Sequence, residues 1–437
     1  MNDLTKGSIK KEFITLAIPL IAGNILQQLY NAVDAFMIGR FAGQEEFAAI
    51  GVAGTVMNLF LFAIVGACTG LSVLFARCYG TGDYDKLKKQ HFTALLTGIM
   101  GTIVLCIISL LGIKGILCLL QTPQELSGYV TEYMRWISMA LPFAFLYNMY
   151  ASALRASGNT LASLLILAAS VVANLCLDFL FVGVFRWGIR GAAEATFFTQ
   201  CISAVLCIFY LIRCRKEMLI RKSDCKIDAC LARDTIKCSI VTAFHQAGLY
   251  IGKMCVQGTV NTGGTPSIAA YTAATRIEGF INSFGDSGSA ITSVLVSQNY
   301  GAKKEERVGR IFRFSMKLMA VGGILCGILL FLTAPMTIAW MQGSASGESV
   351  TQAVSYLRIV SVFYPLCLTG STFTGFFNGV GKVLITFMGT IGQITFRVVA
   401  SWLLFEDFKL CAVAAATGIG WFLANVFWAW NKHRFGK

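Results

Sequence analysis

The chain has 437 residues, of which 56% are hydrophobic and only 13% are charged, and its mean hydropathy is +0.68. These values exclude the two or three soluble domains that a chain of this length could otherwise form. The formal net charge of +14 could indicate nucleic-acid binding. Most of the basic residues, however, fall in the polar segments on one side of the apolar runs, as in the positive-inside bias of membrane proteins. We therefore expect no nucleic-acid partner.

Apolar runs of about 20 residues or more recur along the whole chain, which is the length needed to cross about 30 Å of hydrocarbon. They predict an all-α integral membrane protein of the cell membrane, with both termini in the cytoplasm. We expect twelve transmembrane helices at residues 13–40, 47–76, 92–120, 131–154, 160–185, 190–212, 238–262, 267–297, 311–341, 350–378, 383–405 and 410–431.

The first predicted span carries a polar stripe. Gln27, Tyr30, Asn31 and Asp34 recur there at helical spacing, so that they share one face of the helix. A charge in hydrocarbon costs roughly 2.5 kcal/mol or more, which makes Asp34 a functional candidate. The alternative interpretation is that Asp34 only joins neighbouring helices through hydrogen bonds.

The fifth and sixth spans carry a second polar group. Asn174 and Asp178 stand one turn apart in the fifth span, and Thr196 lies in the sixth. With Asp34 they could supply two carboxylates, an amide oxygen and a hydroxyl, which are the hard ligands that Na⁺ prefers. Two carboxylates close together in a dry site could instead bind H⁺. A third interpretation is that these groups hydrogen-bond only to each other and hold the helices together.

A basic polar segment divides the chain into two halves with six spans each. We predict an N-terminal lobe at residues 1–213, a cytoplasmic linker at 214–237 and a C-terminal lobe at 238–437. Residues 47–80 align with residues 268–301, which indicates an internal duplication. Because each half has an even number of spans, the two lobes should be related by a pseudo-two-fold axis along the membrane normal.

Polar stripes also mark the second half, on the seventh, eighth and eleventh spans. The stripes of the seventh and eighth spans should face either a cavity or the partner lobe. The candidates for a substrate cavity are Gln27, Tyr30, Asn31, Gln246, Lys253, Gln257, Arg276, Glu278, Asn282, Asp286 and Arg397. Lys253 and Arg397 either pair with Glu278 or Asp286, or line the pathway and select substrate charge.

Several motifs resemble the multidrug and toxic compound extrusion (MATE) family over essentially the whole chain. They are IPLIAGNILQQLYNAVDAFMIGRFAG, LRASGNT, NLCLDFLFV with GAAEAT, IAAYTAATRIEGF and VSQNYGAKKEERV. The resemblance implies that Asp34, Asn174, Asp178 and Thr196 form the cation site of the N-terminal lobe. The seventh span has no carboxylate, unlike that of some members, which favours coupling through the N-terminal lobe as in the DinF-like branch.

The resemblance implies a monomeric secondary transporter that exports small organic, often cationic, compounds in exchange for H⁺ or Na⁺, with membrane lipids around it and no cofactor. A flippase for a lipid-linked saccharide is the alternative, and Lys253, Arg276 and Arg397 keep it open. We expect no catalytic residues, because the chain has only three His residues and lacks metalloprotease and phosphate-binding motifs.

Overall fold

The computed structural model describes residues 4–41, 44–119, 122, 124–214, 228–342 and 346–435. Of residues 30–45, 47, 48, 119 and 435 it describes at most the backbone. The regular structure of the described residues is helical throughout, in accord with the predicted all-α class.

The helices follow one another with short connections. They are α1 (Ile9–Phe41), α2 (Gln44–Thr81), α3 (Tyr84–Leu119), α4 (Gln124–Ala156), α5 (Thr160–Asp178), the π-helix η1 (Phe179–Val184), α6 (Gly188–Cys214), α7 (Ala229–Asn261), α8 (Gly264–Gly301), α9 (Glu305–Gln342), α10 (Glu348–Gly379) and α11 (Val383–Phe435). The last of these contains the eleventh and twelfth predicted spans, which are separated by a kink at Lys409 with φ 47°.

Within the described part of the chain, nine helices are long and apolar enough to cross a membrane. The helices outside this group, α7 and α8, carry two of the three polar stripes of the second half, and the polar side chains lower their hydropathy. Both are nevertheless long enough to span the hydrocarbon, at 33 and 38 residues. The fold is therefore that of a multi-pass membrane protein.

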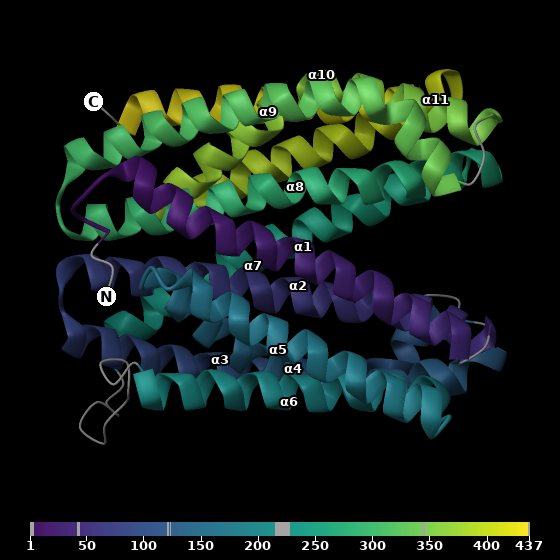
Figure 1. The fold of residues 1–437 in the computed structure, drawn as a ribbon, viewed down its shortest axis with the longest axis horizontal. Helices are drawn as coiled ribbons and strands as arrows, with labels where there is room; N and C mark the ends of the chain where they lie inside the picture. The colour runs from purple at the N-terminus through teal and green to yellow at the C-terminus, as the bar shows by residue number, and fades with distance from the viewer. Residues whose placement is uncertain are drawn as a thin grey trace. The chain divides into compact units, whose positions relative to one another are not determined.

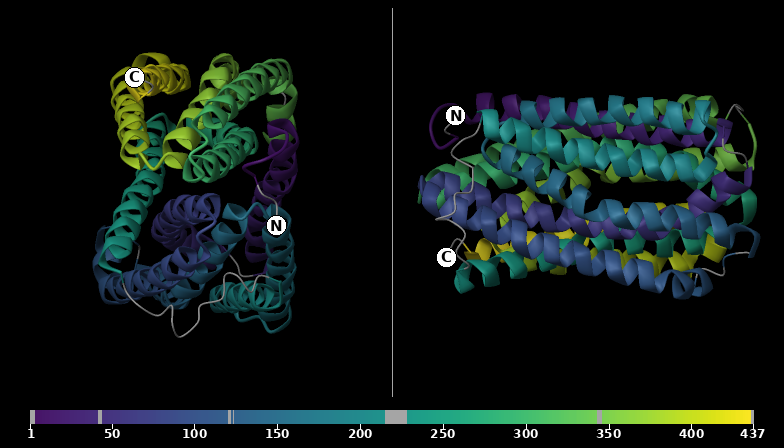
Figure 2. Two further views of the ribbon diagram at one scale, coloured as in Figure 1. Left: turned by 90° about the vertical axis from the view of Figure 1, so that its left-hand side faces the viewer. Right: turned by 90° about the horizontal axis from the view of Figure 1, so that it is seen from below.

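The chain forms two compact units, Ile18–Ala243 and Leu4–Ala17 with Phe244–Lys437. Within each unit the helices run along a common direction (Figures 1 and 2). The beginning of α1 groups with the second unit, and the beginning of α7 groups with the first. The predicted linker at 214–237 includes the first residues of α7, and residues 215–227 lie outside the described residues.

The beginning of α7 is held in the first unit by close backbone contact. A Cβ atom at Gly70 of α2 would lie only 2.6 Å from Thr242 Oγ1 and 2.9 Å from the Cys238 carbonyl oxygen, so that only glycine fits there. Gln90 of α3 donates a hydrogen bond to Thr235 Oγ1 at 2.6 Å. Small residues and interhelical hydrogen bonds are the usual means by which membrane helices pack closely.

The core of the second unit is built around α10, which packs against α8, α9 and α11. Tyr356 and Tyr364 are among its largest fully buried side chains. Buried tyrosines need partners for their hydroxyl groups, and Tyr356 finds one in a site residue described below.

Candidate cation site and substrate-facing residues

Two polar side chains of α5 are completely buried. Asn174 and Asp178 have no exposed surface. Apolar side chains would be the less costly choice at both buried positions. Neither the nitrogen nor the oxygen of the Asn174 side chain has a hydrogen-bond partner among the described residues. A buried amide without a partner costs about 1 to 3 kcal/mol, so an unpaired amide at this position calls for a ligand.

The helix changes its geometry directly after Asp178. The six residues Phe179–Val184 form a π-helix, in which the Phe185 N–H donates to the Leu180 carbonyl five residues earlier at 2.9 Å. Single π-turns inside helices occur often at functional sites. This turn alters the direction of the side chains that follow Asp178.

The neighbouring helix, α6, adds hydroxyl and amide groups. Thr196, Thr199 and Ser203 follow at helical spacing, and the Ser203 hydroxyl donates to Ser170 Oγ of α5 at 2.7 Å. Thr196 is half-buried. The Thr199 hydroxyl and the Gln200 side-chain oxygen have no hydrogen-bond partner among the described residues.

The sequence prediction did not include Thr199. Its spacing from Thr196 and Ser203 is the signal that could have found it. The two helices pack against each other, and they carry a carboxyl, an amide and hydroxyl groups that are buried or half-buried in the first unit. Donors of these kinds suit an alkali cation.

The other predicted residues of the first unit lie on α1. Gln27 is half-buried. Tyr30, Asn31 and Asp34 belong to α1 as predicted, but their side chains lie outside the described residues.

The start of α6 is fixed by Glu46 of α2, the side chain of which accepts a hydrogen bond from the Ile189 N–H at 2.6 Å. Burial raises the pKa of Glu46, the nearby Glu132 carboxylate raises it further, and the hydrogen bond from Ile189 opposes this shift. One residue on, Arg190 forms an ion pair with Glu194 at 2.6 Å. These contacts position the start of the helix that carries Thr196.

In the second unit, two buried tyrosines engage the predicted charges. Tyr356 donates to Glu278 Oε2 at 3.2 Å, and Arg397 donates to the Tyr271 hydroxyl at 3.1 Å. The rings of Tyr271 and Tyr356 meet edge to face with centroids 5.7 Å apart. Arg397 is thus linked to Glu278 through Tyr271 and Tyr356. No direct ion pair between Arg397 and Glu278 occurs among the described residues.

The remaining charged candidates of the second unit, Lys253, Arg276 and Asp286, are exposed. No ion pair joins Lys253 to Asp286 in the described part of the chain. Gln246 and Asn282 are half-buried, and Gln257 donates to Asn261 at 2.9 Å. The second unit therefore has exposed side chains of both charges, whereas the candidate residues of α5 in the first unit are a buried amide and a buried carboxyl group.

The sequence model of the family described as MatE matches the chain twice, at residues 19–180 and 242–403. The chain belongs to the MatE family. The two matched segments are equal in length and correspond to the predicted duplication, with one copy in each half. Membership makes this chain a membrane transporter and not an enzyme.

Curated relatives and solved structures agree with this assignment. The chain is 25% identical to the probable multidrug resistance protein YpnP of Bacillus subtilis, over 87% of this chain and 85% of that protein. It is 22% identical to the probable multidrug resistance protein NorM of Thermotoga maritima, over 94% and 89%. A solved structure described as MATE in complex with MaL6 has the same fold, with a TM-score of 0.92, 21% identity and coverage of 99% of this chain and 98% of that one.

Proposed function

We propose that this MatE family protein exports small organic compounds by antiport with H⁺ or Na⁺, and that the ion binds in the first unit. The observation that carries the proposal is the buried pair on α5. Asn174 and Asp178 are inaccessible, and the Asn174 amide has no partner among the described residues. A coupling ion would supply the missing partner.

The printed names of the relatives support the substrate class. Two of them are described as probable multidrug resistance proteins, and both are matched over most of their length. Multidrug export also suits the exposed charges of the second unit, because Asp286 could attract organic cations.

In the mechanism that we propose, Asn174, Asp178, Thr196 and Asp34 take up an external cation or proton. Binding there favours a conformation with lower affinity for the exported compound, which links ion entry to substrate release. The lobes then alternate between outward and inward access. The coupling residues have no equivalent set in the second half, so one lobe senses the ion.

Transport by reconstituted protein tests the proposal. Vesicles that contain the full chain are loaded with fluorescent organic cations, and either a Na⁺ or an H⁺ gradient is imposed. Wild-type protein should move dye with one of the gradients, whereas Asp178→Asn should reduce transport to the background of empty vesicles. Asp234→Asn, which neutralises an exposed carboxylate of the same unit, is the matched control and should transport normally. Dye movement that is indifferent to both gradients contradicts antiport.

A flippase for a lipid-linked saccharide or a related amphiphile is the second candidate. The exposed Lys253 and Arg276 favour it, because they could bind an anionic headgroup. The same vesicles distinguish the two functions. A flippase would move a labelled anionic amphiphile between leaflets and leave the dye gradient unchanged, and Lys253→Gln with Arg276→Gln would slow that movement.

A further inference from the structure

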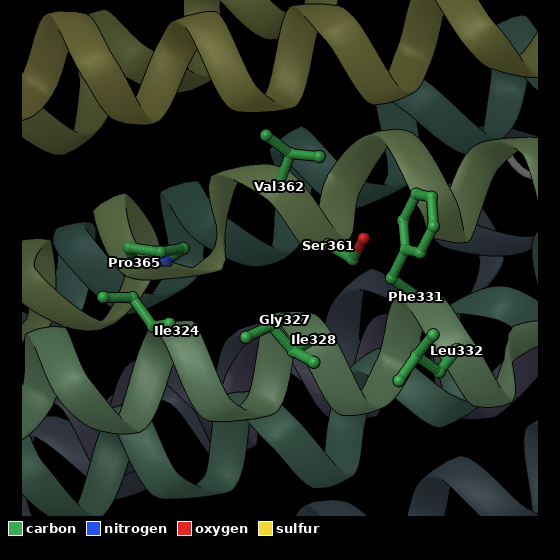
Figure 3. A pocket seen from close by; sticks show the side chains of 8 residues that line it. All are labelled: Ile324, Gly327, Ile328, Phe331, Leu332, Ser361, Val362 and Pro365. Carbon is green, nitrogen blue, oxygen red and sulfur yellow. The ribbon is translucent and has the colours of Figure 1, made fainter.

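A groove opens between α9 and α10 in the second unit, with a volume of about 260 Å³. Figure 3 shows Ile324 beneath Pro365, and Phe331 beside Ser361, with Gly327 between them. The walls are almost entirely apolar, because the Ser361 hydroxyl donates to the Arg358 carbonyl of its own helix at 2.7 Å. The groove therefore suits a hydrocarbon chain.

The shape of the groove follows from two features of the sequence. Gly323 and Gly327 let the helices approach so closely that a Cβ at Gly323 would lie 2.6 Å from the Pro365 Cα, and one at Gly327 would overlap the Ser361 carbonyl oxygen. Pro365 has no N–H, so it leaves that same carbonyl, four residues earlier, without its helical donor. Close approach at the glycines and the larger side chains on either side together leave the hollow.

The positively charged side chain of Arg358 lies at one end of the groove. The guanidinium of Arg358 lies over the Phe331 ring at 5.4 Å from its centroid, and Phe331 lines the groove. Arg358 is exposed although α10 is a membrane span, and it forms no ion pair within the described part of the chain. An arginine at this depth is stabilised by an anionic partner at the lipid interface.

The depth of Arg358 agrees with a lipid headgroup. With 32 residues, α10 is about 48 Å long and extends beyond the hydrocarbon by about 9 Å at each end if it is centred. Arg358 lies about 15 Å from the start of α10, hence about 6 Å inside the hydrocarbon edge, from where its side chain reaches the interface. Pro365 lies near the centre of the membrane, so the groove follows the path of an acyl chain.

The geometry points to a site for one anionic glycerophospholipid, with its phosphate on Arg358 and an acyl chain in the groove between α9 and α10. The inference does not depend on the proposed transport activity.

The duplicated half offers a natural comparison. The sequence YLRIVS at 356–361 of α10 corresponds to YMRWIS at 133–138 of α4, so Arg135 is the counterpart of Arg358. In that half Ser138 is hydrogen-bonded to Ser109 of α3 at 2.7 Å, which joins the two helices at the position where the second unit has its groove. Arg135 is also exposed. The Arg135→Gln variant therefore removes the same charge from the same motif at a place where a hydrogen bond joins the two helices.

Native mass spectrometry of the purified full chain, titrated with phosphatidylglycerol or phosphatidylcholine, tests the site. Wild-type protein should retain one phosphatidylglycerol in preference to phosphatidylcholine. Arg358→Gln should weaken that binding about tenfold, through the loss of a charged hydrogen bond, and Arg135→Gln should leave it unchanged. Arg358→Lys keeps the charge and should retain most of the binding.

A second pair of variants tests the groove. Ile328→Trp fills it, and Leu329→Trp places the same ring on an exposed neighbour that is not among the residues lining it. Only the first should reduce lipid retention. Equal retention by wild type and Arg358→Gln would overturn the inference. So would equal losses in Arg358→Gln and Arg135→Gln, or binding of both lipids with the same affinity.

Discussion

Arg307 of α9 holds the carboxylate of Glu12 at the start of α1, with Nη2 at 3.0 Å from Oε1 and 2.9 Å from Oε2. Both side chains are largely buried, at 11% and 13% exposed. Arg307 also donates to the carbonyl oxygens of Gly7 and Lys6, and Lys304 donates to that of Thr5 at 2.9 Å. Residues 5–12 are thereby bound to the end of the connection between α8 and α9 and to the first turn of α9.

Removing this contact should loosen the second unit. Arg307→Ala deletes the ion pair and the hydrogen bonds to the backbone, and we expect it to lower the free energy of unfolding by about 3 kcal/mol. Glu12→Gln should cost less, because the guanidinium keeps its carbonyl partners. Thermal unfolding of detergent-solubilised protein measures both. Equal melting temperatures for wild type and Arg307→Ala would show that the contact contributes nothing.

The Asn174 amide should be dispensable for folding and necessary for transport. Asn174→Leu keeps the branched shape of the side chain and removes two unpaired polar groups, so the melting temperature should stay the same or rise. Dye efflux should be lost, and if Na⁺ is the coupling ion its addition should stabilise wild type but not the variant. Asn148→Leu is the control, since the Asn148 amide donates to the carbonyl of Ala144 on its own helix at 2.8 Å. Normal efflux by Asn174→Leu would remove this residue from the ion site.

Gly375 should not tolerate a methyl group. A Cβ there would lie 2.5 Å from the Ser289 carbonyl oxygen and 2.9 Å from Thr292 Cβ, between α10 and α8. Gly375→Ala should therefore destabilise the protein by about 1 to 3 kcal/mol. Gly392→Ala serves for comparison, because among the described residues only its chain neighbours and the backbone of its own helix lie near its Cβ position. It should be neutral or stabilising by up to about 1 kcal/mol. Similar melting temperatures for the two variants would contradict the close approach of α8 and α10.

Glu46 should make stability depend on pH. Its pKa is raised in the folded protein, mainly by burial, so the folded state binds the proton more tightly than the unfolded state. Its contribution to stability is therefore complete below the ordinary glutamate pKa and decreases as the pH rises through the raised pKa. Glu46→Gln should remove this component. Melting curves of wild type and variant from pH 4 to pH 7 will show whether their difference changes with pH as expected.

Both termini should face the cytoplasm. The prediction follows from the basic residues between the spans. A fluorescent protein fused after Lys437 should fold and fluoresce, whereas alkaline phosphatase at the same position should be inactive in intact cells. Active phosphatase would reverse the assigned orientation.

Much of the fold could be predicted from the sequence because apolar length and polar spacing are local properties. The twelve spans follow from runs long enough to cross the hydrocarbon, and the duplication follows from the alignment of residues 47–80 with 268–301. Asn174 and Asp178 were predicted for the same reason, since they lie one turn apart in an apolar helix. What the sequence by itself determined is therefore the number of spans, the repeat and the candidate polar layer.

Only the tertiary structure decided how those groups are paired. Arg397 was predicted either to bind an acid directly or to line a pathway; among the described residues it donates to Tyr271 and forms no ion pair with Glu278. The kinked α11 and the π-turn after Asp178 were also unforeseen. The groove beside Arg358 depends on the close contact between Gly327 of α9 and the Ser361 carbonyl of α10. Pro365 cannot donate a helical hydrogen bond to that carbonyl. Such contacts join residues far apart in the chain, and their geometry arises only when the helices pack.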